Sequence, residues 1–83
     1  MERLLRAFAN KRRLMILGLL KERKKMSVTE LAYGIKLSLR STSRHLSVLS
    51  HADLVDREQR GLTVFYTIAP KLDKLAKDIL HHL

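Results

Sequence analysis

The sequence predicts a mainly α-helical fold of five helices with one small β-hairpin near the C-terminal end. One proline and three glycines in 83 residues leave few positions that interrupt helices, so helical segments should dominate. The spacing of apolar residues changes from about 3.6 to about 2 only after residue 54, where the alternation typical of strands begins. A chain of this length holds one compact unit, so we expect residues 1–83 to form a single domain.

The charge of the chain indicates a polyanionic partner. Seventeen Lys and Arg residues against eight Asp and Glu residues give a net charge of +9, which favours nucleic acid. Because cysteine is absent, disulfides, thiolate zinc sites and a cysteine nucleophile are excluded. The longest apolar run, residues 14–20, is far shorter than the roughly 20 residues of a membrane crossing, and no signal-peptide cleavage site follows it. We expect a cytoplasmic, nucleoid-associated protein without membrane contact.

The first two helices are predicted at residues 2–9 and from residue 11 to about residue 22. The first carries apolar residues at helical spacing. Asn10 is a good N-cap for the second helix, whose middle is apolar nearly all round and should therefore lie at the centre of the core. The charged residues 21–25 that follow are interpreted as a solvated loop.

Two further helices, joined by a tight turn, are predicted next. Residues 27–30 begin with serine and end with glutamate, the pattern of a capping box, so a third helix starts there. It ends in a turn at Lys36, after which Ser38 caps a fourth helix over residues 39–51. One face of the fourth helix is apolar. The other face carries a polar and basic stripe of Arg40, Arg44, Ser47 and His51.

A hairpin and a last helix complete the predicted order. Residues 55–59 and 62–68 alternate as strands and are joined through Arg60-Gly61, where glycine permits the positive φ of a tight turn. Pro70 ends the second strand and occupies a position where a helix can begin. The apolar stripes of the first and last helices indicate a partner surface. We expect a homodimer through Leu4, Phe8, Leu72, Leu75, Ile79 and Leu83.

This order of elements is that of a winged helix-turn-helix, in which one helix enters the major groove and the hairpin lies along the DNA backbone. Short segments spread over residues 2–70 resemble the ArsR-type family of bacterial and archaeal repressors. These segments are Ala9-Asn10, Arg13-Leu14, Ile16-Leu17, residues 27–32, Leu37-Ser38, residues 43–46, Val48-Leu49, Leu54-Val55, Arg60-Gly61, Val64 and Tyr66. The resemblance implies a homodimer on a palindromic operator in double-stranded DNA.

The DNA interface is expected on the helix-turn-helix and the wing. Lys36 stands where the family usually has glycine, so its side chain is placed in a conformation that costs about 1 kcal/mol, which a phosphate contact could offset. Leu39 stands where the family often has a glutamine that reaches a base edge, so the alternative at this position is a contact with a thymine methyl. The residues expected to contact DNA are Thr29, Lys36, Ser38, Arg40, Ser41, Ser43, Arg44, Ser47, Arg57, Arg60 and Gly61.

We expect no cofactor, no metal ion and no catalytic residue. The paired cysteines that many metal-sensing members carry on the third helix are missing. Asp78, His81 and His82 have a spacing that can ligate a metal, but a solvated chain end is the simpler interpretation. His45 is interpreted as a packed, hydrogen-bonded histidine rather than a base reader. The sequence has no Gly-rich phosphate loop and no oriented acid beside a nucleophile, and it does not identify an effector.

Three functions remain open at this point. The leading hypothesis is a sequence-specific transcriptional regulator. A sequence-indifferent architectural protein is favoured by the charge of +9 and by Leu39 in place of a polar base reader. A winged-helix module that binds another protein is the third, and the basic fourth helix argues against it.

Overall fold

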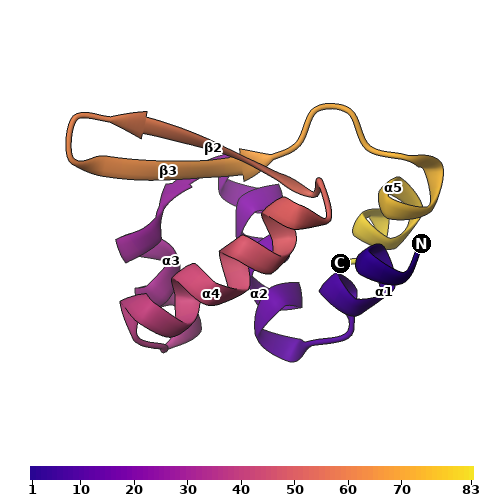
Figure 1. The fold of residues 1–83 in the computed structure, drawn as a ribbon, viewed down its shortest axis with the longest axis horizontal. Coiled ribbons are helices and arrows are strands. Elements are labelled where there is room, and N and C mark those ends of the chain that lie inside the picture. The colour runs from indigo at the N-terminus through magenta and orange to yellow at the C-terminus, as the bar shows by residue number, and fades with distance from the viewer.

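The computed structural model describes residues 1–83 and contains five helices and a three-stranded antiparallel sheet with strand order β1-β3-β2 (Figure 1). The helices are α1 (Glu2–Phe8), α2 (Lys11–Arg23), α3 (Val28–Ile35), α4 (Leu39–His51) and α5 (Lys74–His81). The strands are β1 (Lys25–Ser27), β2 (Val55–Arg60) and β3 (Thr63–Ile68). None of the helices is long and apolar enough to cross a membrane.

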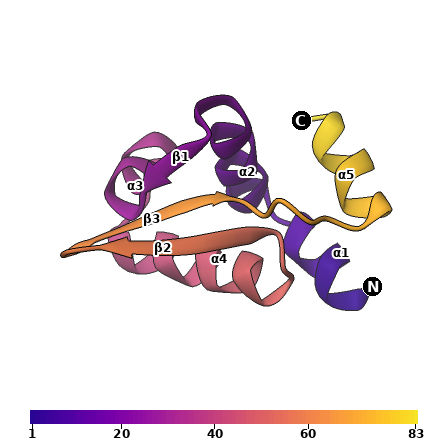
Figure 2. The ribbon, with the colours of Figure 1, turned by 90° about the horizontal axis from the view of Figure 1, so that it is seen from above.

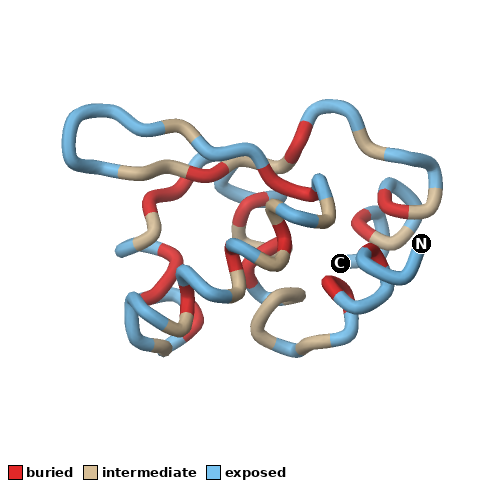
Figure 3. The backbone as a smooth tube through the Cα atoms, in the orientation of Figure 1, coloured by how far each residue is buried: buried red, intermediate tan, exposed pale blue.

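The core forms around α2, as the all-round apolar character of this helix predicts. Ile16, Leu17 and Leu20 of α2 are fully buried. Figure 3 shows buried segments where the helices meet the base of the hairpin, and an exposed hairpin tip. The apolar middle of α2 loses the most water contact when other elements surround it, which explains the central position.

Three helices begin at the caps that the sequence predicts. Asn10 accepts hydrogen bonds from two amides in the first turn of α2. Ser27 and Glu30 form the two reciprocal hydrogen bonds of a capping box, at 3.1 and 2.8 Å. Ser38 accepts a bond from the amide of Ser41. These side chains satisfy amides that have no partner within the helix, and they fix where each helix starts.

The expectation of a two-stranded wing is corrected to a three-stranded sheet. Residues 21–25 are not a solvated loop, because α2 continues to Arg23 and β1 begins at Lys25. Strand β1 pairs with β3, with Lys25 opposite Thr67. The chain makes the abrupt change of direction at Lys24, which has a φ of 75°. Only three residues pair, which is too short a run for alternation to indicate a strand.

Two further boundaries differ from the expected ones. The hairpin turn consists of Gly61 and Leu62 instead of Arg60 and Gly61, because Arg60 still pairs with Thr63. Gly61 has the positive φ, 61°, that the turn requires. The last helix does not begin at Pro70. It begins four residues later, where the Asp73 side chain accepts a hydrogen bond from the backbone amide of Ala76. A carboxylate at the N-cap can accept this bond, whereas a proline side chain has no acceptor.

Helices α1 and α5 lie side by side at one end of the molecule, together with both chain termini, whereas the wing tip lies at the other end (Figures 1 and 2). Ala76 and Leu80 hold α5 against the core. Lys21 of α2 reaches the end of α5, where its Nζ donates to the carbonyls of Leu80, His81 and Leu83 at 2.9, 3.2 and 3.3 Å. A cation at this place complements the negative end of the helix dipole.

Candidate nucleic-acid interface

The turn between α3 and α4 is built around Lys36. This residue has the left-handed conformation expected where the resembled family has glycine, with φ 58° and ψ 48°. Its amide donates to the carbonyl of Tyr33, and the amide of Leu37 donates to that of Ala32 at 3.1 Å. These bonds end α3 abruptly and let α4 begin after two more residues. The Lys36 side chain is exposed.

Helix α4 has a buried face and a basic face. Thr42, Leu46 and Leu49 are fully buried. On the other face Arg40 and Arg44 are exposed, and neither forms an ion pair within the chain. Two free guanidinium groups on one helix face have the geometry to bind phosphates or guanine edges. The exposed residues of α4 among the expected DNA contacts are Arg40, Ser43, Arg44 and Ser47, and Ser41 is half-buried.

His45 lies beside the basic face of α4 and contacts α2. It is half-buried, and Nη1 of Arg13 donates to its Nδ1 at 3.3 Å. Burial, followed by the positive charges of Arg13, Arg12 and Arg44, lowers the pKa of His45 below its ordinary value of 6.5. The half-buried position and the contact with Arg13 confirm the interpretation of a packed, hydrogen-bonded histidine.

Three basic side chains of α2 hold the C-terminal ends of other helices. Arg13 Nε and Nη2 donate to the carbonyls of Ala7 and Arg6, the end of α1, at 2.9 and 2.7 Å. Arg12 donates to the carbonyl of Ile35, the end of α3, and Lys21 binds the end of α5. The sequence contains only a weak signal for these contacts, because orphan helix carbonyls need partners but do not specify which cation supplies them.

In the wing, part of the positive charge is neutralised by Glu58. Its carboxylate accepts from Lys25 Nζ at 2.9 Å and from Arg60 Nε at 2.7 Å. The hydrogen bonds from Lys25 and then Arg60 lower the pKa of Glu58 below its ordinary value. Arg60 therefore already has an anionic partner in the free protein, which sequence reasoning did not detect.

The two expected wing arginines lie on different faces of the sheet. Arg57 is opposite Tyr66 in the register, so it shares the face that carries the buried Tyr66. Arg60, three residues further, is on the other face with Glu58, because side chains alternate along a strand. Both are exposed. Arg57 thus faces the helices, whereas Arg60 does not.

A cleft between α1 and α4 adds two basic residues that were not among the expected DNA contacts. It is lined by Arg3 and Arg6 of α1 and by Ser47 and His51 of α4. Arg3 and Arg6 are exposed. The basic stripe of α4 therefore continues onto α1, toward the end of the molecule that holds the chain termini (Figure 1).

Most of the residues expected in a dimer interface pack against the core of their own chain. Leu4 and Phe8 are buried, and Leu72, Leu75 and Ile79 are half-buried against the core. Their exposed apolar surface is therefore smaller than the helical spacing indicates, because a small domain uses many of its apolar side chains in its own core. Leu83 is 42% exposed and Leu5, which was not among the expected residues, is 51% exposed.

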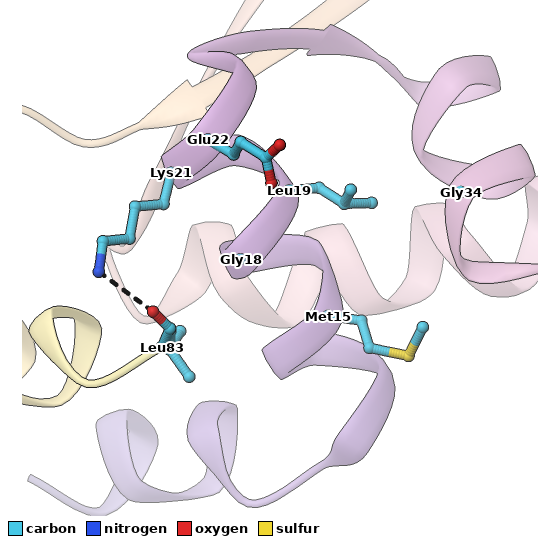
Figure 4. Close-up of a pocket in the computed structure, with 7 residues that line it drawn as sticks. All are labelled: Met15, Gly18, Leu19, Lys21, Glu22, Gly34 and Leu83. Carbon is cyan, nitrogen blue, oxygen red and sulfur yellow. Dashed lines mark hydrogen bonds between the residues drawn. The ribbon is translucent and has the colours of Figure 1, made fainter.

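An open hollow lies beside the chain end (Figure 4). Met15, Gly18 and Leu19 of α2 form one side, and Leu83 lies next to them, bonded to Lys21. Among the residues that line it, only Lys21 and Glu22 have side chains that can bind or transfer a proton. The structure contains no group of three or more His, Asp or Glu side chains placed to hold a metal ion.

Comparison with known proteins gives consistent matches over this architecture. Residues 8–58 match the family described as "Helix-turn-helix domain". The chain is 40% identical over 80 residues to the transcriptional activator HlyU of Vibrio cholerae serotype O1. This alignment covers 96% of this chain and 73% of HlyU. The solved structure of HlyU from Vibrio cholerae N16961 superposes with a TM-score of 0.83, 36% identity and coverage of 98% of this chain and 84% of HlyU.

Two further solved structures show the same fold. NolR from Sinorhizobium fredii superposes with a TM-score of 0.81 and 33% identity, covering 98% of this chain and 77% of NolR. Mb0332 from Mycobacterium bovis, described as a homodimeric winged helix-turn-helix DNA-binding domain and a possible ArsR-family regulator, superposes with a TM-score of 0.82 and 28% identity, covering 98% of this chain and 71% of that fragment.

Proposed function

Because the chain belongs to the ArsR-type family of winged helix-turn-helix transcriptional regulators, we propose that it is a homodimeric repressor of a palindromic operator and not an enzyme. The basic face of α4 carries this proposal. Arg40 and Arg44 are exposed, lack partners and follow the turn at Lys36, which is the position of a recognition helix in this fold. Repression follows where a bound dimer covers a promoter.

The two parts of the interface have different tasks. Side chains of α4 reach base edges in the major groove, so they select sequence. The wing lies beside the duplex and meets the DNA backbone, so it adds affinity to every sequence. Arg60 is in addition held by Glu58, which weakens its attraction for phosphate.

Dimer formation through the end that holds α1 and α5 explains the exposed apolar groups there. Leu5 and Leu83 lie at this end and remain exposed in the single chain. A two-fold axis at this end places two α4 helices on one DNA face, and successive major grooves are about 34 Å apart. The relative Mb0332, described as homodimeric, supports a dimer but does not say which helices form it.

Selection of bound sequences from random duplex DNA at physiological salt tests the proposed function. Recovery of one palindrome with two equivalent half-sites is the expected result. Recovery without a preferred sequence overturns it in favour of an architectural protein, which the net charge of +9 alone would permit. Failure to retain any DNA supports the protein-interaction module.

Arginine variants test the division of tasks between α4 and the wing. Arg40→Ala or Arg44→Ala should cost about 1–3 kcal/mol on the operator and relax the choice of base at one position in each half-site. Arg60→Ala should weaken operator and scrambled DNA about equally. Lys71→Ala removes one exposed charge outside both elements and serves as the control. Equal losses on both DNAs for the α4 variants contradict the proposal.

A further inference from the structure

Leu39 is an exposed apolar residue at the point of α4 from which a recognition helix contacts bases. It is the first residue of α4 and is 53% exposed. Its neighbours Ser38 and Arg40 are polar and exposed, whereas Leu37, two residues earlier, packs against the core. Leu39 is not among the side chains that pack against the core. Its apolar surface is therefore free to contact a partner.

The surroundings of Leu39 form a shallow groove between α4, the start of α3 and the wing. The residues that line it are Ser27, Val28, Thr29, Leu39, Ser43, Leu62, Thr63 and Val64. Thr29, Ser43 and Thr63 are exposed and present hydroxyl groups, which can donate hydrogen bonds to phosphate oxygens. A DNA strand that follows this groove has its backbone against hydroxyl groups and its bases toward the start of α4.

We propose that Leu39 determines specificity by contacting the C5-methyl group of a thymine in each half-site. The inference rests on the proposed function, since it requires α4 in the major groove. The leucine side chain has no hydrogen-bonding group, and the thymine methyl is the apolar group that bases present in the major groove. Burying a methyl against leucine removes apolar surface from water on both sides. Guanine, adenine and cytosine have no methyl group at this edge, so they offer the leucine less apolar surface to cover.

Leu62 provides an internal comparison. It is fully exposed and lies in the same groove, but it belongs to the wing turn instead of a helix. A wing tip beside the duplex meets phosphates or the minor groove, where thymine presents no methyl group. Leu62 and Leu39 are thus two exposed leucines of equal chemistry, of which only Leu39 should respond to the methyl.

The test replaces each thymine of the selected operator by deoxyuridine, which removes only the C5-methyl group. For the wild-type protein we expect one position in each half-site at which replacement weakens binding about fourfold, and replacement in both half-sites about fifteenfold. Leu39→Ala should bind the thymine operator more weakly and respond to deoxyuridine at that position by less than twofold. Leu62→Ala should keep the wild-type response. Circular dichroism confirms that both variants fold.

The outcomes separate this inference from the proposed function. If selection yields a palindrome but no deoxyuridine replacement depends on Leu39, the thymine contact is wrong and the regulator remains. If Leu62→Ala abolishes the response and Leu39→Ala does not, the contact belongs to the wing and the inference is overturned. If selection yields no preferred sequence, the proposed function fails, and specificity through Leu39 fails with it.

Discussion

Thr42 places a hydroxyl group without a partner inside the core. The residue is fully buried in α4, and its Oγ1 has no hydrogen bond. An unsatisfied buried hydroxyl costs about 1–3 kcal/mol. We expect Thr42→Val, which replaces the hydroxyl by a methyl of similar shape, to raise the free energy of unfolding by about 1 kcal/mol. Urea denaturation measures the change.

Thr42→Ser is the matched control because it keeps the hydroxyl and removes the methyl. This variant should be less stable than the wild type, since it loses apolar packing and forms no new interaction. A stability of Thr42→Val below that of the wild type would mean that the hydroxyl has a hydrogen-bond partner in solution.

Two lysines have backbone conformations with positive φ. Comparing glycine variants at the two positions separates the effect of backbone strain on stability from an effect on DNA binding. Lys36 has φ 58° and Lys24 has φ 75°. Because non-glycine residues are strained there, Lys36→Gly and Lys24→Gly should each stabilise the fold by roughly 0.5–1 kcal/mol. Each variant also removes one exposed positive charge. Thermal unfolding gives the stability of both.

DNA binding should distinguish the two glycine variants. Lys36 lies in the turn before the proposed recognition helix, so Lys36→Gly should lower affinity for all sequences and reduce the salt slope by about one unit. Lys24 joins α2 to β1, and Lys24→Gly should leave the slope unchanged. Equal effects of both variants on DNA would exclude a specific phosphate contact by Lys36.

His45 makes stability depend on pH in a defined direction. Its pKa in the folded protein is lowered from 6.5 by burial and by neighbouring arginines. The unfolded chain therefore takes up a proton first as the pH falls, so the free energy of unfolding decreases below about pH 6.5 until the folded pKa is reached. His45→Gln keeps an acceptor for Arg13 and removes the titration.

Denaturation between pH 7.5 and pH 5 tests this pH dependence. The wild type should lose stability over this range, whereas His45→Gln should change less. Glu58 contributes only at the lower end of this range, because its ordinary pKa in the unfolded chain is 4.5 and its pKa in the folded protein is lower. Parallel curves for the two proteins would assign the pH dependence to other groups.

At the scale of elements, the sequence predicts those parts of the fold whose signal is local. Ser27 and Ser38 predict the starts of α3 and α4 because a cap depends on residues within one turn. Strand β1 is missed because it consists of three residues whose pairing is decided by β3, some 40 residues later. Cation contacts such as that of Lys21 with α5 are missed for the same reason. They become evident only when distant segments are placed together.

In the candidate site, too, local features could be predicted and contacts between distant segments could not. The exposure of Arg40 and Arg44 follows from helical periodicity and could be predicted. The pairing of Glu58 with Lys25 and Arg60 depends on which strands are neighbours. The sequence therefore predicts a DNA contact at Arg60 but not its ion pair with Glu58. Strand alternation alone indicates that Arg57 and Arg60 point to opposite faces.

The wing should bind DNA more strongly when Glu58 loses its charge. Glu58 is charged at pH 7, and hydrogen bonds from Lys25 and Arg60 lower its pKa below the ordinary value. Glu58→Gln imitates the protonated side chain and releases both cations toward phosphate. We expect higher affinity for operator and scrambled DNA alike, with a salt slope steeper by about one unit for each additional phosphate that a released cation binds.

Asp56→Asn is the control for the wing. Asp56 is on the same face of β2, two residues from Glu58, and forms no ion pair. Both variants change the net charge equally, but only Glu58→Gln releases held cations. An equal increase in affinity from both would show a general charge effect.

At the scale of the whole molecule, α2 connects the proposed dimer end to the DNA-binding surface. Arg13 donates to the end of α1 and to His45 of α4, and Lys21 donates to the end of α5. The helices that form the proposed dimer contact are thus fixed to the same rigid element as the recognition helix. Their relative placement sets the distance between half-sites in the dimer.

Lys21 therefore has an expected effect on assembly that an exposed lysine without contacts to α5 does not have. Lys21→Met keeps the length of the side chain but removes the cation that binds three carbonyls at the end of α5. Hydrogen bonds from a charged group contribute about 1.5–3 kcal/mol, so α5 should dock less firmly. We expect a dimer dissociation constant at least about tenfold higher, measured by sedimentation equilibrium. Lys77→Met, which removes an exposed cation of α5 itself, is the control.

DNA binding gives an independent measurement for Lys21→Met. Affinity for a two-half-site operator should fall at protein concentrations below the new dimer dissociation constant. The protein is then monomeric, so binding at one half-site no longer brings a second DNA-binding domain to the other half-site. Affinity for a single half-site should stay unchanged, since Lys21 lies in α2, outside α4 and the wing. Loss on the single half-site would instead mean that α5 stabilises the DNA-binding fold. An unchanged dissociation constant would show that the dimer does not depend on how α5 is held.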